Sequence, residues 1–133
     1  MEDRVAALAR YRFEKAQKNL EVAQLLFKDD IYSVALNRTY YAVFDAMRAV
    51  NALESFDSSK HSGVIAHFNQ AYVKTGIFPP EVSSTIRRAS MLREKSDYED
   101  FYEPSREDVE QTMQETMSFL KLVSSYLSES QVL

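Results

Sequence analysis

The fold of this 133-residue chain is decided by residues 31–56, which read IYSVALNRTYYAVFDAMRAVNALESF. As a helix, this stretch would have apolar and aromatic side chains around most of its circumference, at Val34, Leu36, Tyr40, Tyr41, Val43, Phe44, Met47, Val50 and Leu53. A surface helix has one apolar stripe, whereas a helix that is apolar on several faces is surrounded by other elements. We therefore expect a buried central helix that runs to about Leu53.

Three polar side chains, Asn37, Arg38 and Asp45, interrupt this apolar stretch. Buried polar groups cost free energy unless they are paired or functional. Seven residues correspond to about 700° of helical rotation, so Arg38 and Asp45 project from one face, about 10.5 Å apart along the axis. This separation suits a phosphodiester held between the two side chains. Spacing equally allows a structural interpretation, in which Asp45 pairs with Arg48 and Arg38 bridges to another helix.

The segments before and after the central helix have the 3.6-residue apolar periodicity of helices. The first, Asp3–Lys28, has one apolar seam, formed by Phe13, Ala16, Leu20, Ala23 and Phe27. The pair Asp29-Asp30 is expected to end it, and Ser33 is expected to cap the central helix. A third helix is expected to start near His61 behind a serine cap and to end at Thr75-Gly76.

Two more helices are expected after prolines. Pro79-Pro80 breaks the chain, and Pro80 suits the first position of a fourth helix. The last helix opens at Ser105, with Asp108 in a capping-box-like position. Its inward stripe is Val109, Met113, Thr116, Met117, Leu120, Val123 and Leu127. These patterns predict an all-α fold, an antiparallel bundle of four to five helices that forms a single domain over residues 1–133.

Composition excludes several classes of protein. The chain has no cysteine, so disulfide frameworks and thiolate metal sites are impossible. Its net charge of −4 argues against indiscriminate binding of nucleic acid. The acidic residues concentrate between 94 and 115. Three interpretations are open: a basic patch elsewhere on the protein, an acidic face that binds a partner, or a solvated helix end. No leader and no apolar run of membrane-spanning length is present, so we expect a cytoplasmic protein with no membrane partner.

Metal and cofactor chemistry is not indicated. The chain has only two glycines, Gly63 and Gly76, so a glycine-rich phosphate loop is impossible. His61 and His67 are six residues apart, which places them about 120° away from a common helical face. A two-histidine metal site on that helix is therefore unexpected, and we expect no metal and no cofactor.

Four stretches carry a resemblance to a known family. They are ALNRTYYAVFDAMRAV at 35–50, KHSGVIAHF at 60–68, YVKTG at 72–76 and REKSDY at 93–98. In this order they resemble the HEPN-domain family, whose members are often encoded beside minimal nucleotidyltransferases. The first is similar to the family's Arg-Ala-Tyr-Tyr-Ala-x-Phe-His-Ala run, and the last to its Arg-x-x-x-Asp-Tyr element. Together they cover most of residues 10–125.

The resemblance implies a HEPN-like bundle that forms a homodimer, with an active groove at the dimer interface. It also implies a place in a toxin–antitoxin or nucleotide-related module with a nucleotidyltransferase partner. Active members are metal-independent ribonucleases whose motif is an arginine followed, after four to six residues, by a histidine. Arg38 matches the arginine, and Asp45 occupies the histidine position after six intervening residues.

This departure at Asp45 leaves two functions open. An aspartate with a pKa near 4 can only accept a proton, and the loss of a general acid typically costs about 10²–10⁴ in rate. In the first function, the chain is a ribonuclease for single-stranded RNA whose activity is weak or has been lost, with Arg38 binding the phosphate and Asp45 acting as the base. In the second, the same groove is a non-catalytic binding or scaffolding site for a nucleotidyltransferase, a nucleotide or RNA.

Asn37, Tyr41 and His61 complete the candidate site as RNA- or nucleotide-binding residues. Tyrosine rings stack on RNA bases, although core packing is the simpler interpretation for Tyr41 on a central helix. His61 would enter the groove from the third helix, or would be an ordinary polar residue of a first helical turn. Arg93 and Asp97 are expected to form a structural ion pair, four residues apart on one face.

Overall fold

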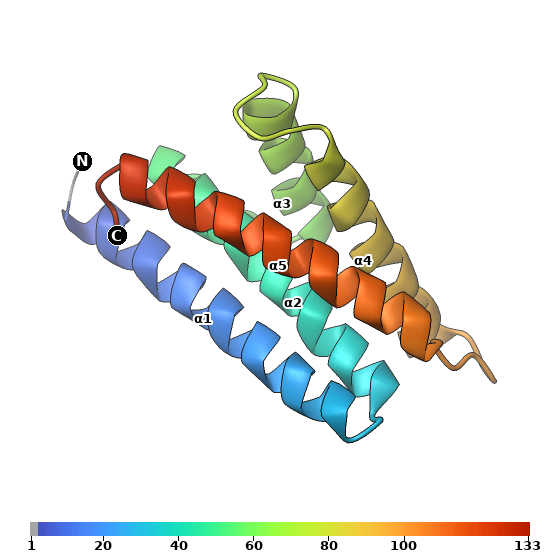
Figure 1. Ribbon diagram of the computed structural model, residues 1–133. Helices are drawn as coiled ribbons and strands as arrows, with labels where there is room; N and C mark the ends of the chain where they lie inside the picture. The colour runs from blue at the N-terminus through green and yellow to red at the C-terminus, as the bar shows by residue number, and fades with distance from the viewer. Residues whose placement is uncertain (1–2) are drawn as a thin grey trace.

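The computed structural model describes residues 3–133, and it is an all-α bundle, as expected (Figure 1). Its α-helices are α1 (Asp3–Lys28), α2 (Tyr32–Asn51), α3 (His61–Phe68), α4 (Glu81–Tyr98) and α5 (Arg106–Glu129). A 3-10 turn, η1 (Ala52–Glu54), extends α2, and a π-helical segment, η2 (Asn69–Val73), extends α3. Among the described residues, no helix is long and apolar enough to cross a membrane.

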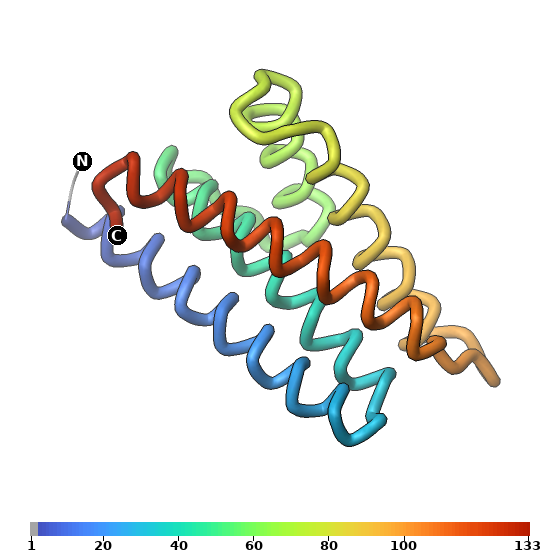
Figure 2. The backbone as a smooth tube through the Cα atoms, viewed as in Figure 1, coloured from blue at the N-terminus to red at the C-terminus, as the bar shows by residue number. Residues whose placement is uncertain are grey.

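The central position of α2 is confirmed, because α2 packs against α1, α3, α4 and α5. In Figure 1, α1 and α5 run alongside α2, while α3 and α4 diverge from each other on the other side of the bundle. The tube in Figure 2 shows that the connection from α4 to α5 projects beyond the end of the bundle.

The core forms where the apolar faces of the helices meet on α2. The side chains of Tyr40, Val43, Met47 and Val50 are at most 1% exposed. A second set of rings packs where η2 and α5 approach, with Phe68 stacked on Tyr72 and most of the other pairs edge to face; its members are Phe68, Tyr72, Phe78, Phe119 and Tyr126. Full burial of one such side chain contributes about 1.5–3 kcal/mol, so the fold is stabilised mainly by packing around α2.

The helix ends agree with the sequence in part. The bounds of α1 are as expected, and Ser105 caps α5 by accepting a hydrogen bond from the backbone N–H of Asp108 at 3.0 Å. The expected cap at Ser33 is wrong, because α2 begins at Tyr32 and Ile31, two residues before Ser33, takes the N-cap position. Asp30 adopts a left-handed backbone (φ 59°), which carries the chain directly from one helix into the next.

Three smaller expectations also need correction. No side chain caps α3, because the Ser58 hydroxyl accepts its bond from Lys60, the N-cap residue itself. Pro80 is the N-cap of α4 and not its first residue. Met117 is 38% exposed and lies outside the buried stripe of α5. The expected stop at Gly76 is confirmed by its φ of +83°, which only glycine adopts without strain.

Candidate functional site

The two main candidates, Arg38 and Asp45, are joined through a residue of another helix. Asn19 on α1 donates from Nδ2 to Oδ2 of Asp45 at 2.9 Å. The same side chain accepts at Oδ1 from Nη1 of Arg38 at 3.1 Å. The amide of Asn19 therefore spans the separation along α2 that sequence spacing predicts, and Arg38 bridges to another helix as the structural interpretation expected.

A second amide fixes the direction of the Arg38 guanidinium. Oδ1 of Asn37 accepts from Nε of Arg38 at 3.2 Å and from Nη2 at 2.7 Å. The guanidinium also lies 5.1 Å from the centre of the Tyr41 ring. Two neutral amides and an aromatic ring thus hold Arg38, and none of them neutralises its charge. Within residues 3–133, Arg38 forms no ion pair.

Asp45 is buried, with only 5% of its surface exposed. Burial raises the pKa of its carboxyl group, while Lys15, Arg48, the Asn19 hydrogen bond and Arg38 oppose that rise. A carboxyl in this environment is protonated more readily than an exposed one. Its carboxyl group accepts a hydrogen bond from Asn19, and through Asn19 it helps to position the Arg38 guanidinium.

Asp45 does not form the ion pair with Arg48 that sequence spacing allowed. Arg48 instead contacts Asp57 at 3.2 Å, and Arg12 of α1 contacts the same carboxylate at 3.0 Å. Burial opposes ionisation of Asp57, but hydrogen bonds from Ser58 and Arg48 outweigh it and lower the pKa of this carboxyl. The linker between η1 and α3 is therefore tied to both α1 and α2, which fixes the start of α3.

His61, the first residue of α3, lies in an aromatic cluster on α2. Its Nδ1 is 2.9 Å from the Tyr40 hydroxyl, and its ring centre is 4.2 Å from that of Phe44. Burial and the nearby cations Arg93 and Arg48 lower the pKa of His61, so its neutral form dominates at neutral pH. Among the described residues, the other ring nitrogen, Nε2, has no hydrogen-bond partner.

Tyr41 connects the Arg38 side chain with the aromatic cluster around His61. Its ring packs edge to face on His61, with centres 5.9 Å apart, and the Arg38 guanidinium lies over it. Arg93 of α4 completes the cluster from the other side, 4.3 Å from the centre of the Tyr40 ring. Arg38, Asn37, Tyr41 and His61 thus form one connected surface, and Asp45 lies beneath it.

Sequence reasoning missed Asn19 and the role of Arg93. Asn19 lies next to the apolar seam of the first helix, beside Leu20, so a polar residue near a buried seam was the available signal. The expected ion pair between Arg93 and Asp97 is confirmed at 3.4 Å. The contact of Arg93 with Tyr40 depends on how α4 crosses α2, which no local pattern shows.

The bridge through Asn19 reaches the protein surface. An open hollow of about 270 Å³ adjoins it, lined by Tyr11, Glu14, Lys15, Lys18 and Asn19. Lys15 and Lys18 outnumber Glu14 in this lining, so the hollow is positive on balance, and Asn19 connects it to the Arg38 guanidinium. Within residues 3–133, no cluster of three or more His, Cys, Asp or Glu side chains is placed to hold a metal ion.

The fold and the site define an all-α bundle with an arginine-centred polar site on its central helix. The HEPN domain family model matches residues 9–126, and the chain belongs to this family. The crystal structure of TT1696 from Thermus thermophilus superposes with a TM-score of 0.73 at 18% identity, covering 88% of this chain and 96% of that one. This second likeness concerns the fold alone.

Two curated relatives are similar over most of their length. A protein of Methanocaldococcus jannaschii named "Putative toxin" is 30% identical over 120 residues, which is 90% of this chain and 82% of the relative. A protein of Thermotoga maritima named "UPF0332 protein" is 32% identical over 119 residues, which is 90% of each chain. The similarity therefore extends over α1 to α5 and includes the helices that carry the site.

Proposed function

We propose that this protein is the toxin-type component of a two-protein module and that it acts on single-stranded RNA. The observation that carries the proposal is the state of Arg38. Its guanidinium is oriented by two amides, is stacked near Tyr41 and keeps its charge unpaired within the described residues. Asn37 and Asn19 accept three of the five N–H groups, so one N–H on each of Nη1 and Nη2 remains to donate to phosphate oxygens, and the positive charge adds to that attraction. The name of the relative from M. jannaschii supports the toxin-type role.

The proposed reaction is a metal-independent cleavage of the RNA backbone. A ribose 2′-hydroxyl attacks the neighbouring phosphorus and gives its proton to a base, while the bond from phosphorus to the 5′-oxygen breaks and that oxygen takes a proton from water. The products are a 2′,3′-cyclic phosphate and a free 5′-hydroxyl. Arg38 stabilises the charge that builds on the phosphate oxygens. The neutral His61, with Nε2 unbonded, is a better base in this structure than the buried Asp45.

Asp45 then has a positioning role. Its carboxyl oxygen accepts from Asn19, and Asn19 in turn holds Nη1 of Arg38. An asparagine at this position retains an oxygen that can accept the same bond, whereas an alanine does not. Asp45→Asn should therefore preserve cleavage and Asp45→Ala should impair it, which separates positioning from direct proton transfer.

The test is cleavage of a fluorescent single-stranded RNA in EDTA by the wild-type protein and matched variants. Arg38→Ala should lower the rate by about 100-fold, and His61→Ala by a similar factor. Arg88→Ala is the control, because Arg88 is an arginine engaged with Glu115 at 3.5 Å and lies outside the site. Cleavage by wild-type protein that survives Arg38→Ala would refute the proposed role of Arg38.

A second function, a non-catalytic binding module, is favoured by the aspartate at position 45. Burial raises its pKa and removes it from direct contact with substrate, whereas the family motif has a histidine there. This function predicts RNA binding without cleavage by the wild-type protein. Asp45→His would then be the variant that cleaves, and Arg38→Ala would abolish binding.

We also propose that the protein is a homodimer with the Arg38 surface at the interface and that it pairs with a nucleotidyltransferase. Val34 supports the first point, because it is 47% exposed and lies one turn before Arg38 on the same face of α2. Val34→Glu should shift the protein to monomer in sizing at micromolar concentration. Leu122→Glu on α5 is the matched control, since Leu122 is also partly exposed. Co-purification with a small nucleotidyltransferase encoded beside the gene tests the partner.

A further inference from the structure

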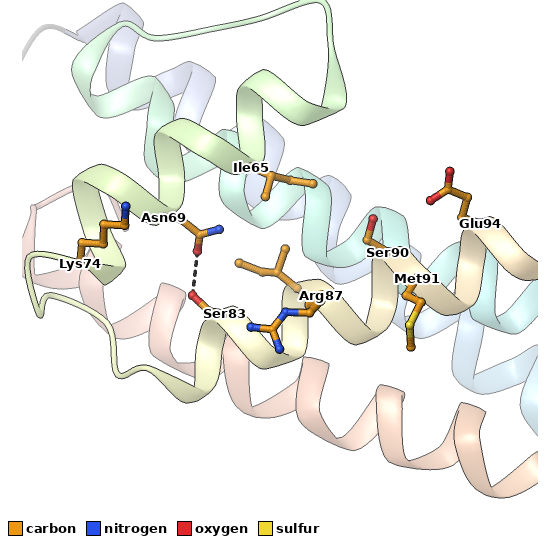
Figure 3. A pocket seen from close by; sticks show the side chains of 9 residues that line it. Ile65, Asn69, Lys74, Ser83, Arg87, Ser90, Met91 and Glu94 are labelled. Carbon is orange, nitrogen blue, oxygen red and sulfur yellow. Dashed lines mark hydrogen bonds between the residues drawn. The ribbon is translucent and has the colours of Figure 1, made fainter.

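A cavity of about 520 Å³ lies between the α3–η2 segment and α4, outside the site described above (Figure 3). Its volume is within the range of small-molecule sites. The cavity lies where α3 and α4 diverge in Figure 1, and η2, which continues α3 in π-helical form, contributes Asn69 to its lining. Single-turn π segments are frequent at functional sites.

The lining of the cavity changes along its length. Figure 3 shows Lys74 at one end and Glu94 at the other, with Ile65 and Met91 between them on opposite walls. Arg87 extends toward Ser83, whose hydroxyl donates to Oδ1 of Asn69 at 2.9 Å. The cavity thus has a cationic end, an apolar middle and an end with a carboxylate acceptor.

The charges of this cavity are not used by the protein itself. Neighbouring arginines on α4 are paired, Arg88 with Glu115 at 3.5 Å and Arg93 with Asp97 at 3.4 Å. Among the ion pairs of residues 3–133, none includes Lys74, Arg87 or Glu94. Two cations and one carboxylate therefore remain available to a ligand that carries an anionic group and a hydrogen-bond donor.

The cavity and the candidate site are neighbours on α3, and one end of the cavity lies near Arg93 on α4. On α3, Ile65 lies one turn after His61, on the same face of the helix. On α4, Arg93 directly precedes Glu94, and its guanidinium lies 4.3 Å from the ring centre of Tyr40, the partner of His61. The end of the cavity formed by Ile65 and Glu94 is therefore the end nearer to His61.

We propose that the cavity between α3 and α4 is a nucleotide subsite for the single-stranded RNA whose reacting phosphodiester lies at Arg38. Lys74 and Arg87 contact a backbone phosphate, and the base lies between Ile65 and Met91. Glu94 accepts a hydrogen bond from the exocyclic amino group of the base. Uracil is the one RNA base without such a group, so the subsite favours the amino-bearing bases, such as adenine, over uracil. The inference rests on the proposed action on RNA, and it adds the location and the base preference.

The experiment is equilibrium binding of fluorescent 2′-O-methyl decanucleotides, followed by anisotropy in EDTA. These strands cannot be cleaved through the 2′-hydroxyl, so binding is measured apart from chemistry. Oligoadenylate should bind about fivefold more tightly than oligouridylate, and Glu94→Ala should remove most of this preference. Arg87→Ala should weaken both strands and lower the slope of log affinity against log salt by about 0.7, the loss of one phosphate contact. Arg88→Ala is the matched control and should change neither quantity.

The outcomes separate this inference from the proposed function. If Arg38→Ala abolishes binding while Arg87→Ala and Glu94→Ala behave as wild type, the subsite is refuted and the proposed action on RNA stands. If the wild-type protein binds no strand, both proposals fail. Binding that requires Arg87 but not Arg38 would mean that the RNA strand does not contact both sites, and it would refute the inference. Adenosine monophosphate that binds in an Arg87-dependent manner, with no binding of the strand, would make the cavity a small-molecule site and overturn the inference.

Discussion

The amide bridge at Asn19 leads to a quantitative prediction for Asn19→Ala. This change removes the hydrogen bond to Oδ2 of Asp45 at 2.9 Å and the bond from Arg38 at 3.1 Å. A hydrogen bond to a charged acceptor contributes about 1.5–3 kcal/mol, and Asp45 is too buried for water to replace the donor fully. We expect the free energy of unfolding at pH 7 to fall by about 2 kcal/mol. With a urea m-value of about 1.5 kcal/mol/M, the midpoint falls by roughly 1.3 M.

The loss should depend on pH with a defined sign. The Asn19 bond lowers the pKa of Asp45, so it contributes stability only where Asp45 is ionised. The difference between Asn19→Ala and wild type should therefore shrink as the pH falls through the pKa of Asp45 in the folded protein, which burial raises above its ordinary value. Urea titration followed by circular dichroism at several pH values measures this difference.

The control for this prediction is Gln17→Ala, which removes an exposed amide from the same helix and should change stability by less than about 0.5 kcal/mol. In an Asp45→Asn background, Asn19→Ala should lose about 1 kcal/mol less than in wild type, because the charge is gone. Equal losses for Asn19→Ala and Gln17→Ala, or a loss independent of pH, would refute the bridge.

Three further outcomes follow from the same structure. Asp45→Asn should raise the melting temperature at pH 7, because burial raises the pKa of Asp45 and its ionised form destabilises the folded state, and the gain should disappear at acidic pH. Tyr40→Phe should lower the free energy of unfolding by about 1 kcal/mol in urea, since it removes only the hydroxyl that contacts His61 and retains the ring packing. Ser105→Ala should lower it by a similar amount, about 1 kcal/mol, because the cap on Asp108 is lost, whereas an unchanged urea midpoint would exclude that cap.

Local sequence patterns predicted the elements of the fold well because they depend on neighbouring residues. The bounds of α1, the cap at Ser105 and the stop at Gly76 each follow from residues within a few positions. The expected cap at Ser33 was wrong, because α2 starts after a left-handed Asp30 with Ile31 as its N-cap and without a side-chain hydrogen bond. Alternative starting residues of a helix differ by small free energies, so helix propensity alone does not choose between them.

The sequence by itself determined the all-α fold, the central place of α2 and the choice of Arg38 and Asp45, because helical periodicity and polar residues within an apolar stretch are local properties. Only the tertiary structure decided what those side chains contact. Asn19 joins them from α1, Asp57 takes Arg48 away from Asp45, and the cavity lies where α3 and α4 diverge. Each of these contacts depends on the distance and rotation between helices, and packing around α2 fixes both.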